Sequence, residues 1–485
     1  MKALFSNPAL LKVISVLSSV FNGVTKPTLF LLLLMSLAMC ALNDCKSIRS
    51  MYRQFVSSVA KISLNSLYAL FRVAKIETAS WACYLFLFIV RHMPLACSPY
   101  SIYLVIDDTL IEKFGTHFQG GSRLFDHSAH KGKQYINGHC VASLLVVVPL
   151  INADGVVTFV RIPLLHRLWI PKKCKCKDKK TGKKKRVWTL KEVESDTESI
   201  VADIPYKSKH QILREMMERV ISSYGDKNFV LLADSWYAKG EILDFVNDHA
   251  NVEAVFSVPV NTALYDVELP KRTGKRGRPR EVGDRLFLED FILSDIAQTH
   301  YYAGWRDVTT NLFGKKKRVR ALLTESKETK SRRLFICTNP DVCVIPLDYI
   351  KDKAVCAMGQ AIPETQCFAC YVLRWQIEVT YLELKSHWSF SKYMLRSMTG
   401  IERLINLQMV VYAVLSILPW IDTAFQHLKD VSIQERRYEL GKAINQDLFL
   451  RSVTERLQTE GNSKEILTAF DRLAQKMRHF FKTGS

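Results

Sequence analysis

The stretch Tyr103-Leu-Val-Ile-Asp-Asp-Thr109 decides the fold, because a short apolar, β-prone run ends there in two acids. Such a run is typical of a strand buried in a sheet. A second run, Phe229-Val-Leu-Leu-Ala-Asp234, has the same form and also ends in an acid. Ligands of α/β proteins gather at the carboxyl ends of strands, so the pair predicts a site as well as a sheet. Taken alone, either acid would be better explained as part of a turn or a helix cap.

Further strands and helices are predicted around these two runs. Two Val-, Leu- and Ile-rich segments, Cys140–Leu150 and Val156–Leu164, flank the turn Asn152–Gly155 and predict neighbouring strands. Downstream, the predicted order is helix, strand, helix, strand, over His210–Ser223, Phe229–Ala233, Lys239–Val246 and Glu253–Val258. This order favours an α/β architecture with a mixed sheet and flanking helices.

The rest of the chain divides by character. Residues 1–100 are predicted to be helical, and a helix-turn-helix module and a plain helical bundle fit them equally well. The pattern loosens after Pro259 into short alternating runs, which predict a mainly β insertion. Pro363 opens a long predicted helix through Trp388, because proline is tolerated at the first helical position. The resulting segments are 1–100, 101–258, 259–345, 346–421 and 422–485, the last being helical.

The chain carries a large excess of positive charge. Lys and Arg number 68 against 47 Asp and Glu, a formal net charge of +21 in 485 residues. This excess indicates a polyanionic partner, nucleic acid before an anionic membrane surface. Three basic runs hold much of it, Lys172–Lys191, Lys271–Arg280 and Lys315–Arg320. Any one of them could be only a solvated loop, whereas three around one core favour DNA binding.

Two of the basic runs supply candidate DNA-binding residues. Arg276-Gly-Arg-Pro-Arg280 resembles an AT-hook, which lies in a narrow minor groove, although a flexible basic hairpin tip explains it equally well. The candidates are Arg276, Arg278, Arg280, Lys315, Lys316 and Lys317.

Membrane, disulfide and zinc interpretations are weaker. The uncharged run Leu29–Leu42 would span about 21 Å as a helix, short of the roughly 30 Å of a bilayer core. A buried core helix is therefore favoured. The twelve cysteines mostly lie singly in apolar runs, which indicates free thiols in a reducing cytoplasm. The pairs Cys174/Cys176 and Cys367/Cys370 are too far apart in sequence to favour a structural zinc site.

The predicted helix after Pro363 carries the most specific pattern. Tyr371, Arg374, Glu378 and Lys385 lie at offsets of 0, 3, 7 and 14. At about 100° per residue, their side chains fall within roughly 60° of one helix face. Simple ion pairing could explain this stripe. A metal-type carboxylate beside phosphate-binding cations is also what phosphoryl transfer requires.

With these residues in view, the sequence resembles the DDE transposases of bacterial insertion sequences that carry the YREK pattern. Tyr371, Arg374, Glu378 and Lys385 match that pattern at every position and spacing, and the Asp motifs at 107–108 and 234 match the first and second acids. The resemblance covers roughly residues 100–420. It implies an RNase H-like core with a β-rich insertion, and a catalytic, metal-binding triad of Asp108, Asp234 and Glu378, with Asp107 as a variable neighbour.

The resemblance also implies a function and partners. The chain is expected to bind double-stranded DNA, both the terminal inverted repeats of an element and its target. It would hydrolyse phosphodiester bonds and transfer strands with two Mg²⁺ ions, for which Mn²⁺ could substitute. Tyr371 and Arg374 would grip the phosphate near the scissile bond, and Lys385 the 5′ side of the cut. Residues 1–100 would bind the DNA ends, and a homodimer would form in the synaptic complex, with 422–485 available for dimerisation.

Further expectations complete this interpretation. The location would be the bacterial cytoplasm, with the nucleoid, and no membrane would be involved. A hairpin intermediate is in doubt because no Trp stands in Arg333-Leu-Phe335, where some members stack a flipped base, although Phe335 or Trp305 could substitute. The main alternative function is a non-catalytic DNA-binding protein derived from a transposase, against which the intact triad argues. A membrane protein with basic loops is the third.

Overall fold

The computed structural model describes residues 5–45, 47–96, 101–114, 118–126, 132, 134–171, 174–177, 184–186, 206–223, 227–269, 281–459, 468 and 471–472. The chain forms two compact units. The first joins both ends of the chain, Met1–Phe88 and Leu382–Ser485, and the second is Ile89–Tyr381. Both candidate Asp motifs and Glu378 belong to the second unit, whereas Lys385 belongs to the first.

The second unit is built on a mixed sheet of twelve strands in which β10, β9, β12, β13, β14, β8, β7, β1, β3 and β2 follow one another, with β11 beside β12 and β4 beside β3. The strands are β1 (Ile102–Glu112), β2 (Ser122–Phe125), β3 (Tyr135–Ile151), β4 (Val157–Trp169), β7 (Phe229–Ala233), β8 (Val252–Val258), β9 (Leu264–Tyr265), β10 (Arg285–Leu286), β11 (Ser294–Asp295), β12 (Tyr301–Thr310), β13 (Lys317–Ser326) and β14 (Arg332–Cys337). A separate two-stranded sheet pairs β5 (Cys174–Lys177) with β6 (Lys184–Arg186).

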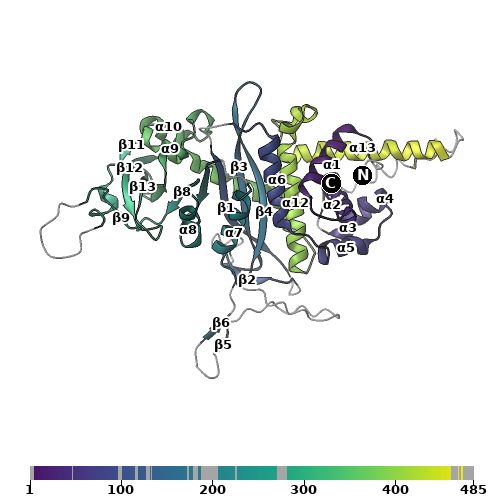
Figure 1. The fold of residues 1–485 in the computed structure, drawn as a ribbon, viewed down its shortest axis with the longest axis horizontal. Helices are drawn as coiled ribbons and strands as arrows, with labels where there is room; N and C mark the ends of the chain where they lie inside the picture. The colour runs from purple at the N-terminus through teal and green to yellow at the C-terminus, as the bar shows by residue number, and fades with distance from the viewer. Residues whose placement is uncertain are drawn as a thin grey trace. The chain divides into compact units, whose positions relative to one another are not determined.

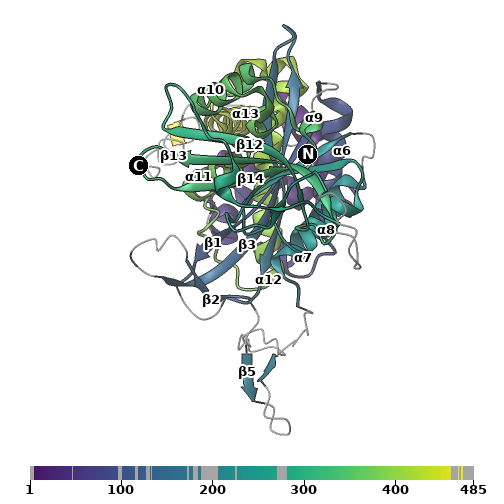
Figure 2. The same ribbon diagram turned by 90° about the vertical axis from the view of Figure 1, so that its left-hand side faces the viewer.

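The central strands confirm the predicted mixed α/β fold. β1 is antiparallel to β3 and parallel to β7, and β7 is parallel to β8. Figure 1 shows β1, β3 and β4 side by side. This arrangement is consistent with an RNase H-like core. The insertion strands do not form a sheet of their own, because β14 pairs with β8 and carries β12 and β13 into the same sheet (Figure 2).

Helices cover both faces of this sheet. On one face lie α7 (Lys209–Ile221), packed on β3 and β4, and α8 (Glu241–Asp248), packed on β8. On the other face a shared core joins β1, β7 and β8 to α9 (Pro340–Cys343), α10 (Lys353–Ala361) and the helix η5 (Pro363–Arg374). Because side chains alternate along a strand, odd positions of β1, such as Tyr103 and Val105, face η5.

The long predicted helix after Pro363 is present in two parts. Pro363 stands at its first turn, as expected, but η5 is a 3₁₀-helix of twelve residues, and α11 (Trp375–His387) continues it as an α-helix. Runs of 3₁₀-helix beyond three or four residues are uncommon. In a 3₁₀-helix residues three apart are eclipsed, so Tyr371 and Arg374 stand closer to one line than the α-helical prediction assumed.

The first unit is a helical assembly made from both ends of the chain. Its helices are α1 (Pro8–Val20), α2 (Lys26–Ala41), α3 (Ile48–Met51), α4 (Ser57–Val59), α5 (Leu64–Arg72), α12 (Met398–Ile421) and α13 (Ile433–Thr459), with α6 (Thr78–His92) and α11 crossing the boundary between the units. Short 3₁₀ or π segments complete the described elements, namely η1 (Tyr52–Val56), η3 (Leu288–Asp290), η4 (Leu347–Tyr349) and η6 (Thr423–Leu428).

Buried polar contacts join the two ends within this unit. Arg437 of α13 donates to the Met39 carbonyl oxygen at 2.8 Å and to that of Leu42. Arg403 of α12 donates to the Phe71 carbonyl oxygen at 3.1 Å. These guanidinium groups satisfy carbonyl oxygens at helix ends, where no backbone partner remains. The N-terminal and C-terminal segments therefore fold as one body.

Apolar helices fill the core of this unit. Residues Leu32–Cys40 of α2 are buried, which confirms the predicted core helix. Among the described residues, one helix, α12, has the length and apolar composition of a membrane-spanning helix, and 89% of its most apolar window is buried in the protein.

Candidate functional site

Asp107 and Asp234 extend two rows of side chains that face η5. Tyr103 and Val105 of β1, and Val230 and Leu232 of β7, all lie in the core shared with η5. Position 107 continues the first row and position 234 the second, because side chains two apart on a strand point the same way. The β-strand alternation therefore brings these two acids to one face of the sheet.

Arg374 joins this face to Glu378. Its Nη1 lies 3.6 Å from Asp107 Oδ2, and its Nη2 donates to Glu378 Oε1 at 2.6 Å. The Arg374 and Asp107 side chains are 16% and 18% exposed, and Glu378 is more open at 34%. Arg374 ends η5 and Glu378 lies in the first turn of α11, so the junction of the two helices positions both groups.

The ionisation of Asp107 reflects its crowded surroundings. Burial raises the pKa of Asp107 from 3.8 to about 7, and the charges of Asp108 and Asp234 add to the rise, although Arg374 lowers it. Asp234 is therefore close enough to affect the ionisation of Asp107. Paired carboxylates that resist ionising together are typical of catalytic and metal-binding sites.

Asp108, the residue favoured from the sequence, lies on the opposite face of β1. Its Oδ2 accepts from Lys209 Nζ at 2.7 Å and from Cys140 Sγ at 3.0 Å, and its Oδ1 accepts from the Tyr237 hydroxyl. The motif register had favoured Asp108, but adjacent residues on a strand point to opposite faces. Asp107, and not Asp108, shares a face with Arg374 and Glu378.

The other predicted site residues fall into three groups. Tyr371 lies on η5 with its ring 5.1 Å from that of Phe335, and burial raises the pKa of Tyr371 to about 12. Lys385 belongs to the other unit, so it is not placed relative to the acids. The DNA-binding candidates Arg276, Arg278 and Arg280 lie outside the described residues, as does most of the Lys172–Lys191 run.

The lysines before β13 are described. Lys315 is exposed, Lys316 pairs with Glu281, and Lys317 Nζ lies 4.0 Å from Glu253 Oε2 and 5.0 Å from the Phe313 ring centroid. Lys315 and Lys316 are both exposed, and of these two only Lys316 has an ion pair among the described residues.

The sequence analysis named Asp107 only as a variable neighbour of Asp108 and did not single out Lys209 or Tyr237. The signal for Asp107 was present, because the strand alternation from Tyr103 assigns its face. Lys209 and Tyr237 carried no local signal, since each reaches Asp108 from a different part of the chain.

The chemistry of the acids fits a hard divalent cation, because carboxylate oxygens are the ligands that Mg²⁺ prefers. Burial is the main cause of the raised pKa of Asp107, and the smaller contribution from neighbouring acids would be relieved by such a cation. Within the described ranges, however, no group of three or more His, Cys, Asp or Glu side chains is arranged to hold a metal ion. Asp107 and Asp234 thus fit the role as a pair, while Glu378 is engaged with Arg374.

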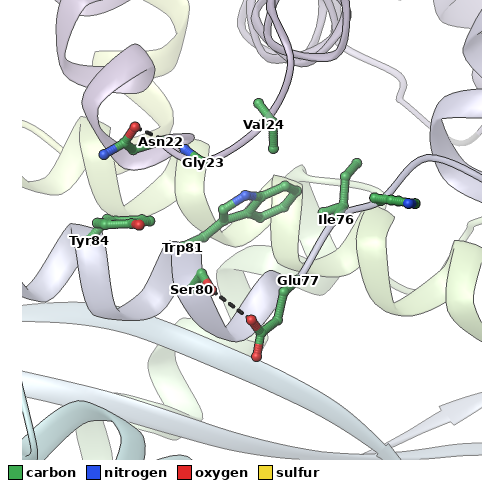
Figure 3. Close-up of a pocket in the computed structure, with 9 residues that line it drawn as sticks. Asn22, Gly23, Val24, Ile76, Glu77, Ser80, Trp81 and Tyr84 are labelled. Carbon is green, nitrogen blue, oxygen red and sulfur yellow. Dashed lines mark hydrogen bonds between the residues drawn. The ribbon is translucent and has the colours of Figure 1, made fainter.

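A cavity in the first unit is unrelated to these acids. It is formed by the loop after α1 and the start of α6, with Trp81, Tyr84 and Glu77 among its lining residues (Figure 3). Ser80 Oγ donates to Glu77 Oε2 at 3.0 Å at its edge. The lining lacks the grouped acids of a phosphoryl-transfer site.

Comparison with known proteins settles the family. The family model described as "DDE superfamily endonuclease" matches residues 20–316, more than half of the chain. The chain belongs to the DDE superfamily endonuclease family. The matched region of this DDE protein holds Asp107, Asp108 and Asp234 but ends before Tyr371, so the third acid rests on the structure and the motif alone.

Two further comparisons add little to this. The DDE protein is similar to a solved structure described as "Cryo-EM structure of piggyBac transposase synaptic complex with hairpin DNA". The identity is 9%, the match covers 97% of this chain and 84% of the other, and the TM-score is 0.38, too low to support an argument. A search of curated proteins found no match.

Proposed function

We propose that this DDE protein is a cut-and-paste transposase of the bacterial insertion-sequence type, which cleaves the ends of a DNA element and joins them to a target. The observation that supports the proposal is the contact of the Arg374 guanidinium with both Asp107 and Glu378, close to the end of β7 that Asp234 follows. Ligands of α/β proteins bind at the carboxyl ends of the strands, where Asp234 lies.

The residues divide the work as follows. Asp107, Asp234 and Glu378 would hold divalent cations, Mg²⁺ or Mn²⁺, and Asp107 takes the part first assigned to Asp108. Such cations, when bound, would supply activation of a hydroxyl nucleophile and stabilisation of the negative charge on the leaving oxygen. Arg374 and the Tyr371 hydroxyl would hold the phosphate next to the scissile bond, since a guanidinium binds phosphate in a bidentate manner. Lys385 would contact the 5′ side of the cut.

The binding partner would be double-stranded DNA, as the net charge of +21 indicates. The exposed Lys315, with Lys316 and Lys317, would contact the phosphate backbone, and Arg276, Arg278 and Arg280 a minor groove. The helical residues 1–100 would recognise the element ends, with two copies of the chain meeting in the synaptic complex. The place of action would be the bacterial cytoplasm, at the nucleoid, without a membrane.

The test is cleavage of a plasmid that carries the DNA flanking the coding sequence on both sides, with Mg²⁺ or Mn²⁺ present. Glu378→Ala should abolish strand cleavage, because it removes the third carboxylate, and should leave DNA binding in a gel-shift assay largely intact. Glu364→Ala, an exposed acid at the start of η5, is the matched control and should cleave as wild type does.

The outcome separates the proposal from its alternative. Cleavage by Glu378→Ala at the wild-type rate would remove Glu378 from the catalytic assignment. Absence of cleavage by the wild-type protein, with DNA binding retained, would favour the non-catalytic DNA-binding protein.

A further inference from the structure

We infer that Asp108, Tyr237 and Lys209 form a clasp that sets the separation of Asp107 and Asp234. These three are positioning residues, because they act through the two acids on the other face of the sheet. The inference rests on the proposed function, since it concerns the same acids.

The backbone pairing of β1 with β7 stops just before the acids. The last recorded pair in this parallel ladder is Val105 with Leu232, and Asp107 and Asp234 each lie two residues beyond it. Strand hydrogen bonds therefore do not fix the acids relative to each other, although they would be the next pair on this face. Another contact has to hold the two segments together at this point.

Asp108 supplies that contact from the opposite face. Its Oδ1 accepts from the Tyr237 hydroxyl, and Tyr237 belongs to the turn that follows β7. Tyr237 N donates to the Asp234 carbonyl oxygen at 3.1 Å, and Trp236 N donates to Asp234 Oδ1 at 2.9 Å. This compact turn makes Asp234 and Tyr237 move as one, so the Tyr237 hydroxyl ties Asp234 to the strand that carries Asp107.

The clasp is buried and its charge is compensated. Tyr237 is 1% exposed, and Lys209 Nζ lies 2.7 Å from Asp108 Oδ2. The Lys209 ammonium also lies 4.8 Å from the Trp169 ring centroid and 5.0 Å from that of Trp236. Buried hydrogen bonds to a charged group hold one geometry, because breaking one leaves a buried polar or charged atom without a partner.

The clasp also opposes a repulsion. Asp107 and Asp234 continue two neighbouring rows on one face of the sheet, and two carboxylates in such positions repel each other when both are charged. Without the Tyr237 hydroxyl, the turn that carries Asp234 could move away from β1 and relieve that repulsion. The pair would then bind a divalent cation less tightly.

The experiment is Mn²⁺ binding to the full-length, DNA-free protein, measured by electron paramagnetic resonance. Tyr237→Phe removes one hydroxyl and changes no charge near the acids, so electrostatics alone predicts no effect. We expect about tenfold weaker Mn²⁺ binding, in the range found when groups that support metal ligands are removed. Thr310→Val is the matched control, because it also removes a buried hydroxyl, one that donates to the Ala263 carbonyl oxygen at 3.0 Å, and it should bind Mn²⁺ as wild type does.

The outcomes distinguish the clasp from general destabilisation and from failure of the proposed metal site. Mn²⁺ affinity of Tyr237→Phe equal to that of wild type would overturn the clasp. Equal losses in Tyr237→Phe and Thr310→Val would also overturn it, because the effect would then follow general destabilisation. If Asp107→Asn and Asp234→Asn bind Mn²⁺ like wild type, the proposed metal site itself fails, and the clasp with it.

A second variant covers failure of Tyr237→Phe to fold. Cys140→Ala removes the thiol that donates to Asp108 Oδ2 at 3.0 Å and is also neutral in charge. Because this thiol helps to orient the Asp108 carboxylate that accepts from Tyr237, its loss should weaken Mn²⁺ binding in the same direction, and an unchanged affinity would count against the clasp.

Discussion

Asp107 and Asp108 are neighbours in sequence with opposite surroundings. Asp107 faces Arg374 and the helix η5, whereas Asp108 is bound by Lys209 and Tyr237 on the other face. Motif matching selects a sequence position but carries no information about which face of a strand that position occupies. The alternation from Tyr103 and Val105 does carry it, so this part of the site could be predicted from the sequence, once the direction of one side chain on the strand was known.

The raised pKa of Asp107 makes stability depend on pH. Because the folded-state pKa of about 7 lies above the ordinary 3.8, the folded chain binds a proton more tightly between these values. The free energy of unfolding therefore falls as pH rises from about 4 to about 7 and stays low above it. Asp107→Asn cannot ionise, so at pH 8 it should be more stable than wild type, by an amount on the order of a few kcal/mol.

Urea unfolding of the DNA-free and cation-free protein at pH 4, 6 and 8 measures this. The advantage of Asp107→Asn should shrink toward zero at pH 4, where the wild-type carboxyl is protonated. Asp154→Asn, in the exposed turn between β3 and β4, is the control and should follow the wild-type profile. Parallel profiles for wild type and Asp107→Asn would contradict the raised pKa.

The Arg374 guanidinium lies between Asp107 and Glu378 and supplies the positive charge that a bound cation would otherwise bring. Since it contacts both Asp107 and Glu378, a divalent ion has to compete with its guanidinium in the DNA-free protein. Arg374→Gln should therefore bind Mn²⁺ more tightly than wild type, by about tenfold if one buried ion pair is relieved. Calorimetric titration of the DNA-free protein with Mn²⁺ gives the affinities.

Arg374→Lys distinguishes the contact of the guanidinium with both acids from the effect of its positive charge alone. It keeps the positive charge but lacks the forked group that reaches both acids, so its Mn²⁺ affinity should fall between those of wild type and Arg374→Gln. If Arg374→Lys matches wild type, only net charge matters. If neither variant binds more tightly, Arg374 does not compete for the acids.

At the scale of elements, short apolar patterns predicted strands well where every residue of the strand is buried in the core. Phe229–Ala233 is β7 as predicted, because five buried apolar residues leave no other solution. β1 was expected to end at Ile106 but runs to Glu112, since its pairing with β3 continues from Asp107 opposite Ser143 to Glu112 opposite Gly138. That partner is distant in sequence and leaves no local signal.

The 3₁₀ form of η5 could not be predicted for a similar reason. Cys367, Phe368 and Leu373 of η5 lie in the core shared with the sheet, and helix propensity is a weak preference that such tertiary packing can override. The predicted stripe from Tyr371 to Lys385 assumed one regular α-helix, whereas these residues are divided between the 3₁₀-helix η5 and α11.

Gly441 controls how closely α13 approaches α2. A Cβ at this position would lie 2.5 Å from the Cys40 carbonyl oxygen, closer than real contacts allow. Gly441→Ala should therefore lower the free energy of unfolding by about 1–3 kcal/mol, although alanine is the better helix former. Chemical denaturation followed by circular dichroism measures it.

Gln446→Ala, at an exposed position of the same helix, is the control and should change the stability by less than about 0.5 kcal/mol. A Gly441→Ala protein as stable as wild type would show that α13 can move away from α2 without loss.

At the scale of the whole molecule, the positive charge predicts how DNA binding responds to salt. Each phosphate contact contributes about 0.9 to the slope of log affinity against log salt concentration. Lys315→Gln should therefore lower that slope by about 1. Lys317→Gln should lower it less, because Lys317 is partly buried and lies 4.0 Å from Glu253.

Fluorescence anisotropy with a labelled duplex at several salt concentrations measures both slopes. The two variants remove the same charge two residues apart, so each is the control for the other. Equal slopes for wild type and Lys315→Gln would exclude Lys315 from the DNA contact.

The first unit takes its residues from both ends of the chain, Met1–Phe88 and Leu382–Ser485. Met1–Phe88 is synthesised before Leu382–Ser485, so the helical unit cannot be completed until α12 and α13 have been made, whereas Ile89–Tyr381 is continuous in sequence. A polypeptide cut short within α12 would therefore keep every residue of the sheet and its acids but lack the partners that the N-terminal helices require.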